Sequence, residues 1–299
     1  MSLVSMNELL EHAGKHSYAV GYFESWDLYS LQATVAAAEE QNSPLILGVG
    51  GLSANHTWLR EVGIRAFGPV VNEMAEKASV PIATLFNEGD SVLESEIAIQ
   101  AGYGAVMMHT EGWPWEQLIA DTRTVVDKAH SRAVAVEGEV GALPEITEGG
   151  LDESRASKTT VEQAVEFVSA TGVDCLAVAV GNVHFVTTSF VPNVDIELIR
   201  AIDDAVDVPL VMHGGSGTPD DQMRAAIAAG ITKINVGTKL KTLFGKKLRE
   251  TISADKNWDP NMALGSHLDG DWLTISSAAV HAEVSRLIQV FGSNGKASS

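Results

Sequence analysis

The sequence has little of several features that commonly decide the class of a protein. It contains one cysteine, Cys175, in 299 residues, so an internal disulfide cannot form. This favours a reducing cytoplasm, and the apolar run around the thiol predicts that it is buried. No apolar run approaches the roughly 18 residues of a membrane span, which argues against a transmembrane protein. The N-terminus also lacks the charged start and apolar stretch of a signal peptide.

Positive charge is scarce as well. There are 20 Lys and Arg against 39 Asp and Glu, which gives a net charge of −19. This argues against nucleic acid or an anionic membrane as the main partner and favours a soluble, freely diffusing protein. Hydrophobic residues make up 45% of the chain, enough for a large core. Because no Pro/Gly/Ser-rich linker divides the sequence, we expect residues 1–299 to form a single domain.

Short β-rich apolar runs alternate with stretches of helical periodicity. The apolar runs are "SYAVGYF", "PLILGV", "PIATLF", "GAVMMH", "RAVAVEGEV", "CLAVAVG", "PLVMHG" and "TKINVG". The helical stretches include "LYSLQATVAAAEEQ", "WEQLIADTRTVVDKAH" and "TVEQAVEFVSATG". Apolar strands separated by helices indicate a parallel sheet that is covered on both faces. The pattern predicts the α/β class and a (β/α)8 TIM barrel, with a doubly wound open sheet as the alternative.

Polar residues follow the ends of the predicted strands, where such barrels carry their active sites. Strand three ends at Asn87 and Glu88, and strand four at His109. Strands six and seven are followed by His184 and His213. Because these two strands are adjacent, their imidazoles can converge, and imidazole is a common metal ligand. We therefore predict that both histidines bind a metal ion.

Two glycine-containing turns follow the last two strands. After strand seven the chain has "HGGSGTP", and after strand eight it has "NVGT". In barrels these loops frequently hold phosphate through backbone N–H groups and a helix N-terminus. The predicted phosphate-binding residues are Gly214, Gly215, Ser216, Asn235, Val236, Gly237 and Thr238.

Longer segments resemble the class II, metal-dependent ketose-bisphosphate aldolases, the fructose- and tagatose-bisphosphate aldolase family. They include "ESEIAIQAGYGAVMM", "VAVEGEVGAL", "TGVDCLAVAVGNVH" and "VPLVMHGGSGTPDDQMRAAIAAGITKINVGT". The resemblance implies an enzyme, a homodimer or homotetramer, that reversibly cleaves a ketose phosphate. Dihydroxyacetone phosphate and an aldehyde would be the products, and Zn²⁺ or another divalent metal would stabilise the enediolate.

The resemblance also implies roles for individual residues. His184 and His213 match the zinc histidines of the family, and both glycine turns match its phosphate-binding segments. Glu139 matches an acidic residue associated with a second metal position.

The chain departs from the family most clearly after strand three. The family has Asp-His-Gly there, with the Asp handling a proton and the His binding zinc. This chain has Asn87 and Glu88, followed by glycine. An amide is not a useful acid or base near neutral pH, so Asn87 cannot take over the Asp role. Glu88 can be the third ligand, since two His and one Glu form a catalytic zinc set. Alternatively, Glu88 is the base and His109, which replaces a family Asp, is the ligand.

Further departures concern the substrate side of the site. Glu24 stands where the family has Asn, and Phe185 where it has Gly. The phosphate-contacting lysine of the family is missing from "HFVTTSF". Gly237 and Lys239 replace two Asp residues, and Lys239 could restore positive charge near the phosphate. This clustering indicates altered substrate or altered chemistry.

Three alternatives remain at this stage. Lys233 could form a Schiff base in a metal-free aldolase, or be a structural lysine paired with a carboxylate. The chain could instead be an inactive paralogue that binds a sugar phosphate, which Asn87 favours. Residues 144–160 are either a surface loop or a lid that carries an acid, Glu145 or Glu148.

Overall fold

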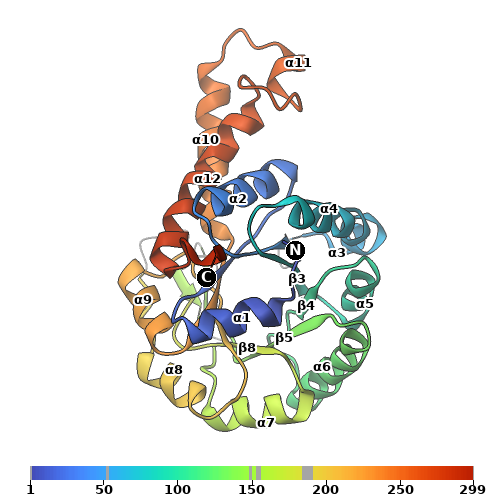
Figure 1. The fold of residues 1–299 in the computed structure, drawn as a ribbon, viewed down its shortest axis with the longest axis vertical. Helices are drawn as coiled ribbons and strands as arrows, with labels where there is room; N and C mark the ends of the chain where they lie inside the picture. The colour runs from blue at the N-terminus through green and yellow to red at the C-terminus, as the bar shows by residue number, and fades with distance from the viewer. Residues whose placement is uncertain (1, 52–53, 148–149, 153–155, 184–190, 299) are drawn as a thin grey trace.

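The computed structural model describes residues 2–51, 54–147, 150–152, 156–183 and 191–298, and its centre is a closed barrel (Figure 1). Its strands are β1 (Val20–Phe23), β2 (Leu45–Gly50), β3 (Ile82–Gly89), β4 (Ala105–Met108), β5 (Ala135–Val140), β8 (Cys175–Val178), β9 (Leu210–Met212) and β10 (Ile231–Val236). All neighbouring pairs are parallel, and β1 closes the barrel against β10 with Val20 opposite Lys233. The predicted (β/α)8 barrel is confirmed, and the open sheet is wrong.

Helices surround the barrel on the outside (Figure 1). They are α2 (Leu28–Glu40), α3 (His56–Trp58), η1 (Leu59–Gly63), α4 (Ile64–Lys77), α5 (Val92–Gln100), α6 (Trp115–His130), α7 (Val161–Thr171), α8 (Ile196–Asp203), α9 (Asp220–Ala228), α10 (Thr238–Ala254) and α12 (Trp272–Phe291). Helix α7 ends at a glycine, because Gly172 has a φ of 73°, which L-residues rarely adopt. In the described part of the chain, none of the helices is long and apolar enough to cross a bilayer.

Two apolar layers follow from the alternation of side chains along the strands. One lies between barrel and helices, and includes Phe23, Phe86 and Ile234. The other fills the barrel interior and includes Cys175, which is fully buried as predicted. Helix α1 (Met6–Lys15) buries its apolar side in this inner layer and covers one end of the barrel. The polar residues lie at the opposite end of the barrel, which is formed by the carboxyl ends of the strands.

Two features were not anticipated from the sequence. Within residues 144–160, β6 (Glu145–Thr147) and β7 (Gly150–Asp152) form a small antiparallel hairpin, while Glu148 lies outside the described residues. At the C-terminal side, the end of α10, the short α11 (Pro260–Ala263) and the start of α12 project beyond the barrel as an arm (Figure 1). The chain then returns along α2 and ends with η2 (Lys296–Ser298).

Candidate active site

A group of buried polar side chains lies inside the carboxyl end of the barrel. They come from β3, β5, β10 and the residue after β9, and they are Asn87, Glu88, Glu137, Glu139, His213, Lys233 and Asn235. Alternation along a strand accounts for most of these directions, because residues two apart, such as Glu137 and Glu139, share one face. The predicted clustering of polar groups at the strand ends is therefore present in three dimensions.

Glu88 reaches the site through an unusual backbone conformation. Its φ is 58°, in the left-handed region that non-glycine residues seldom occupy. This turn lets Asn87 and Glu88 both face inward, although they are consecutive. The Asn87 side chain accepts a hydrogen bond from Asn235 Nδ2 at 3.4 Å. A strained conformation held at a polar site is typical of a functional position.

His213 is oriented by a carboxylate behind it. Its Nε2 donates to Glu137 Oε1 at 2.8 Å, and both side chains are buried. Its Nδ1 faces the site, 3.7 Å from Glu88 Oε1 and 3.5 Å from Glu139 Oε1. Metal-binding histidines commonly donate their second N–H to a carboxylate in this way, because the contact orients the ring. Sequence reasoning gave Glu137 no role, and its position two residues before Glu139 in β5 was the available signal.

The distances at His213 fit ligands of one metal ion. Two ligands of a tetrahedral zinc, each about 2.0–2.1 Å from the ion, lie roughly 3.3 Å apart. His109 Nδ1 lies 3.6 Å from Glu139 Oε2, and it is buried without a hydrogen bond from any described residue. A buried nitrogen of this kind, beside several carboxylates, suits a divalent cation. The donor set present therefore fits the metal that the sequence predicted.

Electrostatics within the group favour a cation at this position. Burial raises the pKa of the Glu88 carboxyl to about 7, and the attraction of His213 only partly offsets this. Burial alone would lower the pKa of His109, but the Glu139 carboxylate raises it to about 9. Each carboxylate thus lies where a cation would stabilise its ionised form.

Lys233 is fully buried and engaged in an ion pair. Its Nζ lies 2.7 Å from Glu137 Oε2, donates to Asn235 Oδ1 at 2.6 Å and lies 5.2 Å from the Tyr22 ring centre. A Schiff-base lysine must present its amine to the substrate carbonyl, whereas the Lys233 Nζ is already engaged by Glu137 and Asn235. The geometry therefore supports a structural lysine, which was the alternative role considered for it.

The two glycine turns meet beside the N-terminus of α10. Ser216 Oγ accepts hydrogen bonds from the backbone N–H groups of Gly237 at 3.3 Å and Lys239 at 3.1 Å. Gly214 has a φ of 70°, and a Cβ there would lie 2.4 Å from the Val183 carbonyl oxygen. Close approach of the first turn to the segment after β8 thus requires glycine at this position.

The remaining members of the predicted phosphate-binding set have different surroundings. A Cβ on Gly215 would lie 2.7 Å from Ile234 Cγ2, so this glycine also permits close packing. Thr238 is the first residue of α10. Val236 is buried in the outer apolar layer, so only its backbone is available to a ligand.

His184, the other predicted metal ligand, lies outside the described residues, as does Phe185. The residues just before it are described, and they lie next to the site. Asn182 Nδ2 donates to the His213 carbonyl oxygen at 2.9 Å. Residue 182 therefore lies beside His213.

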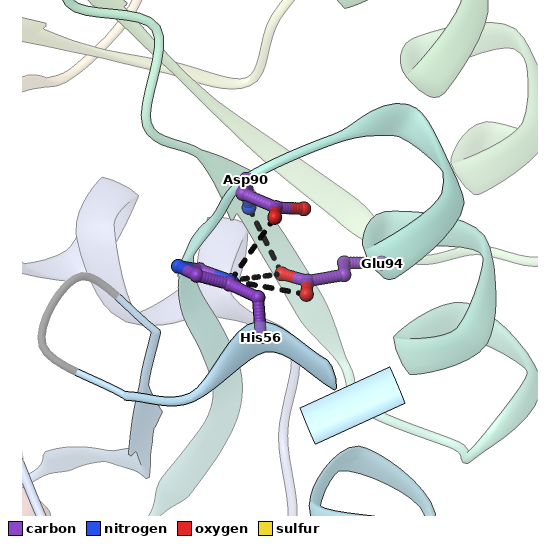
Figure 2. A group of neighbouring side chains, drawn as sticks. All are labelled: His56, Asp90 and Glu94. Atoms are coloured by element: carbon purple, nitrogen blue, oxygen red, sulfur yellow. Dashed lines mark hydrogen bonds and ion pairs between the residues drawn. The ribbon is translucent and has the colours of Figure 1, made fainter. Parts of the chain in front are cut away.

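A second cluster of metal-binding residue types lies outside the barrel interior (Figure 2). His56 Nδ1 lies 3.0 Å from Glu94 Oε1 and 3.4 Å from Asp90 Oδ2. In the described part of the chain it is the one group of at least three such residues whose donor atoms lie within 4.8 Å of one another. However, Arg60 Nη1 contacts the same carboxylates, Asp90 at 2.9 Å and Glu94 at 3.2 Å. Because a guanidinium already pairs with both carboxylates, we interpret this cluster as structural support for the turn after β3.

Comparisons with known proteins point to one family. The family model "Fructose-bisphosphate aldolase class-II" matches residues 4–296. The chain is 35% identical to a fructose-bisphosphate aldolase of Geobacillus stearothermophilus, with 99% of each chain covered. It is 35% identical to a probable fructose-bisphosphate aldolase of Bacillus subtilis strain 168, with 89% of this chain and 92% of the relative covered. Among solved structures, the YdjI aldolase of Escherichia coli K12 is 31% identical, with a TM-score of 0.82 and 99% of each chain covered.

Proposed function

Because this chain belongs to the class II fructose-bisphosphate aldolase family, and is thus a carbon–carbon lyase of carbohydrate metabolism, we propose that it reversibly cleaves a phosphorylated ketose. The substrate is fructose or tagatose bisphosphate or a related sugar, and the products are dihydroxyacetone phosphate and an aldehyde. Residues 1–299 act as one (β/α)8 domain. The observation that carries the proposal is the Glu137–His213 pair, because Glu137 holds the His213 ring with Nδ1 on the side of Glu88 and Glu139.

The proposed metal site consists of His184, His213 and Glu88, with Glu139 at a second position. When bound, Zn²⁺ or another divalent metal supplies Lewis-acid stabilisation of the enediolate charge. Glu137 holds the His213 ring so that Nδ1 faces the metal position. His109 is the alternative ligand, since its Nδ1 also faces Glu139.

The proposed substrate contacts flank this centre. Gly214, Gly215 and Ser216, together with the segment 235–238, bind the phosphate at the N-terminus of α10, where the helix dipole favours an anion. Asn87, held by Asn235, orients a substrate hydroxyl through hydrogen bonds, because its amide cannot exchange a proton near neutral pH. Fixing the ketone over the metal position lowers the entropic part of the barrier.

Activity and metal measurements on the same preparation test this function. Protein purified without chelator is expected to contain about one equivalent of divalent metal by mass spectrometry and to cleave fructose or tagatose bisphosphate. Chelation should abolish cleavage, and borohydride should leave no sugar adduct on Lys233. Activity that survives chelation and is trapped by borohydride would instead support a Schiff-base enzyme. Binding of ketose phosphates without cleavage of any would support the inactive, sugar-phosphate-binding paralogue.

We further propose that the protein is a homodimer or homotetramer that works in the cytoplasm. Support for the oligomer comes from the arm, which carries exposed apolar side chains far from the barrel core. They are Ile252, Trp258, Met262, Leu264 and Leu268, each between 44% and 51% exposed. Apolar side chains gathered on a projecting element are typical of a contact surface. The cytoplasmic location rests on the single, buried cysteine.

Introducing charge on the arm tests whether the arm forms the contact between subunits. Replacing Leu264 and Leu268 with glutamate is expected to lower the mass measured by light scattering, because a charge in an apolar contact is poorly solvated. Leu93→Glu is the matched control, since Leu93 is 54% exposed on α5, away from the arm. A monomeric wild-type protein, or an unchanged oligomer in the double variant, would contradict the proposal.

A further inference from the structure

Glu24, directly after β1, fills a space that two glycines leave open. A Cβ on Gly237 would lie 2.0 Å from Glu24 Oε2, and a Cβ on Gly50 would lie 2.9 Å from Glu24 Oε1. These glycines end or follow the two strands on either side of β1. The carboxylate is therefore held across the mouth of the barrel, next to the N-terminus of α10. Its side chain is only 18% exposed.

The partner of Glu24 is a lysine in the first turn of α10. Lys241 Nζ lies 2.5 Å from Glu24 Oε1 and 5.9 Å from the Trp26 ring centre. A cation near a helix N-terminus opposes the helix dipole, so this position is favourable for Lys241 only beside an anion. The lysine side chain is 38% exposed and can exchange its partner for an anion that arrives from solvent.

A nearby cation would strengthen anion binding at this end of α10, because the chain has a net charge of −19. The segment "HFVTTSF" contains no lysine or arginine, and Lys233 is already paired with Glu137 inside the barrel. Two lysines remain in the first turn of α10. Lys239 is exposed, whereas Lys241 lies over Trp26 and reaches the barrel mouth at Glu24.

We propose that Lys241 binds the phosphate group of the ligand and that Glu24 is the anion which this phosphate displaces. Without ligand, the carboxylate keeps the ammonium at the barrel mouth. When the phosphate reaches the amides around Ser216, Lys241 exchanges one ionic contact for another. This inference rests on the proposed phosphate site at the N-terminus of α10, and it adds to that site a side-chain cation from this chain's own sequence.

Binding of inorganic phosphate and of dihydroxyacetone phosphate, measured by calorimetry, tests the proposal. Lys241→Met is expected to weaken both about tenfold or more, because a hydrogen bond to a charged group is lost. Lys241→Arg should restore most of the affinity. Glu24→Gln should strengthen binding, since the competing anion is removed, and this gain should vanish in the Glu24→Gln/Lys241→Met double variant.

Controls separate this inference from the proposed function. Lys15→Met removes a lysine that lies 2.5 Å from Glu11 on α1, and it should leave phosphate affinity unchanged. Equal affinity of wild type and Lys241→Met, or a loss confined to Lys239→Met, would overturn the role of Lys241 and leave the aldolase function standing. If the wild type binds neither ligand, the phosphate site itself is wrong, and the inference falls with it.

Discussion

Replacing His213 with alanine is expected to remove the bound divalent metal and to abolish aldol cleavage. The imidazole is one of few donors at the centre, and its loss leaves Glu88 and Glu139 facing each other without it. Metal content by mass spectrometry and cleavage of a ketose bisphosphate measure the two effects. Normal metal content in His213→Ala would show that the metal site lies elsewhere.

Two further variants test whether metal binding depends specifically on His213 and its support. Glu137→Gln keeps the size of the side chain that supports His213, and it should lower metal affinity by about 10–100-fold, as is usual for such supporting contacts. His281→Ala is the control, because this histidine pairs with Glu40 on the outside of the barrel. It should retain both metal and activity.

Replacing Glu88 with glutamine is expected to release the metal, because a neutral amide is a poor zinc ligand compared with a carboxylate. If Glu88 were instead the base, the same change would keep the metal and lower turnover by about 10²–10⁴-fold. Glu94→Gln changes a buried carboxylate in the cluster with Arg60 and should not alter metal content. Loss of metal in Glu94→Gln, with metal retained in Glu88→Gln, would instead assign the metal to the cluster that contains His56.

The reverse substitution tests the same position. Asn87→Asp combined with Glu88→His restores the family motif, and histidine tolerates the left-handed backbone of residue 88 better than most residues. We expect the double variant to bind zinc and to raise cleavage of a ketose bisphosphate. If it binds zinc but cleaves no ketose phosphate, the aldolase proposal loses its main support.

The sequence by itself determined the barrel and the end of the barrel that carries the site. Both depend on local information: apolar runs predict strands such as β10, and Gly172 marks the end of α7. Parallel strands then bring their carboxyl ends to one rim whatever their order. Residues next to strand ends, such as Asn87 and His213, could therefore be located from their neighbours in sequence alone.

Only the tertiary structure decided how those residues pair. Glu137 became the support of His213 because β5 and β9 lie on either side of β8, a neighbourhood that sequence separation does not reveal. The direction of Glu88 depends on one backbone angle, which no periodicity predicts. The pair of Glu24 and Lys241 joins residues 217 positions apart, and it exists because neighbouring glycines leave the space for it. Local pattern places a residue on a face, whereas long-range packing determines which partner it meets.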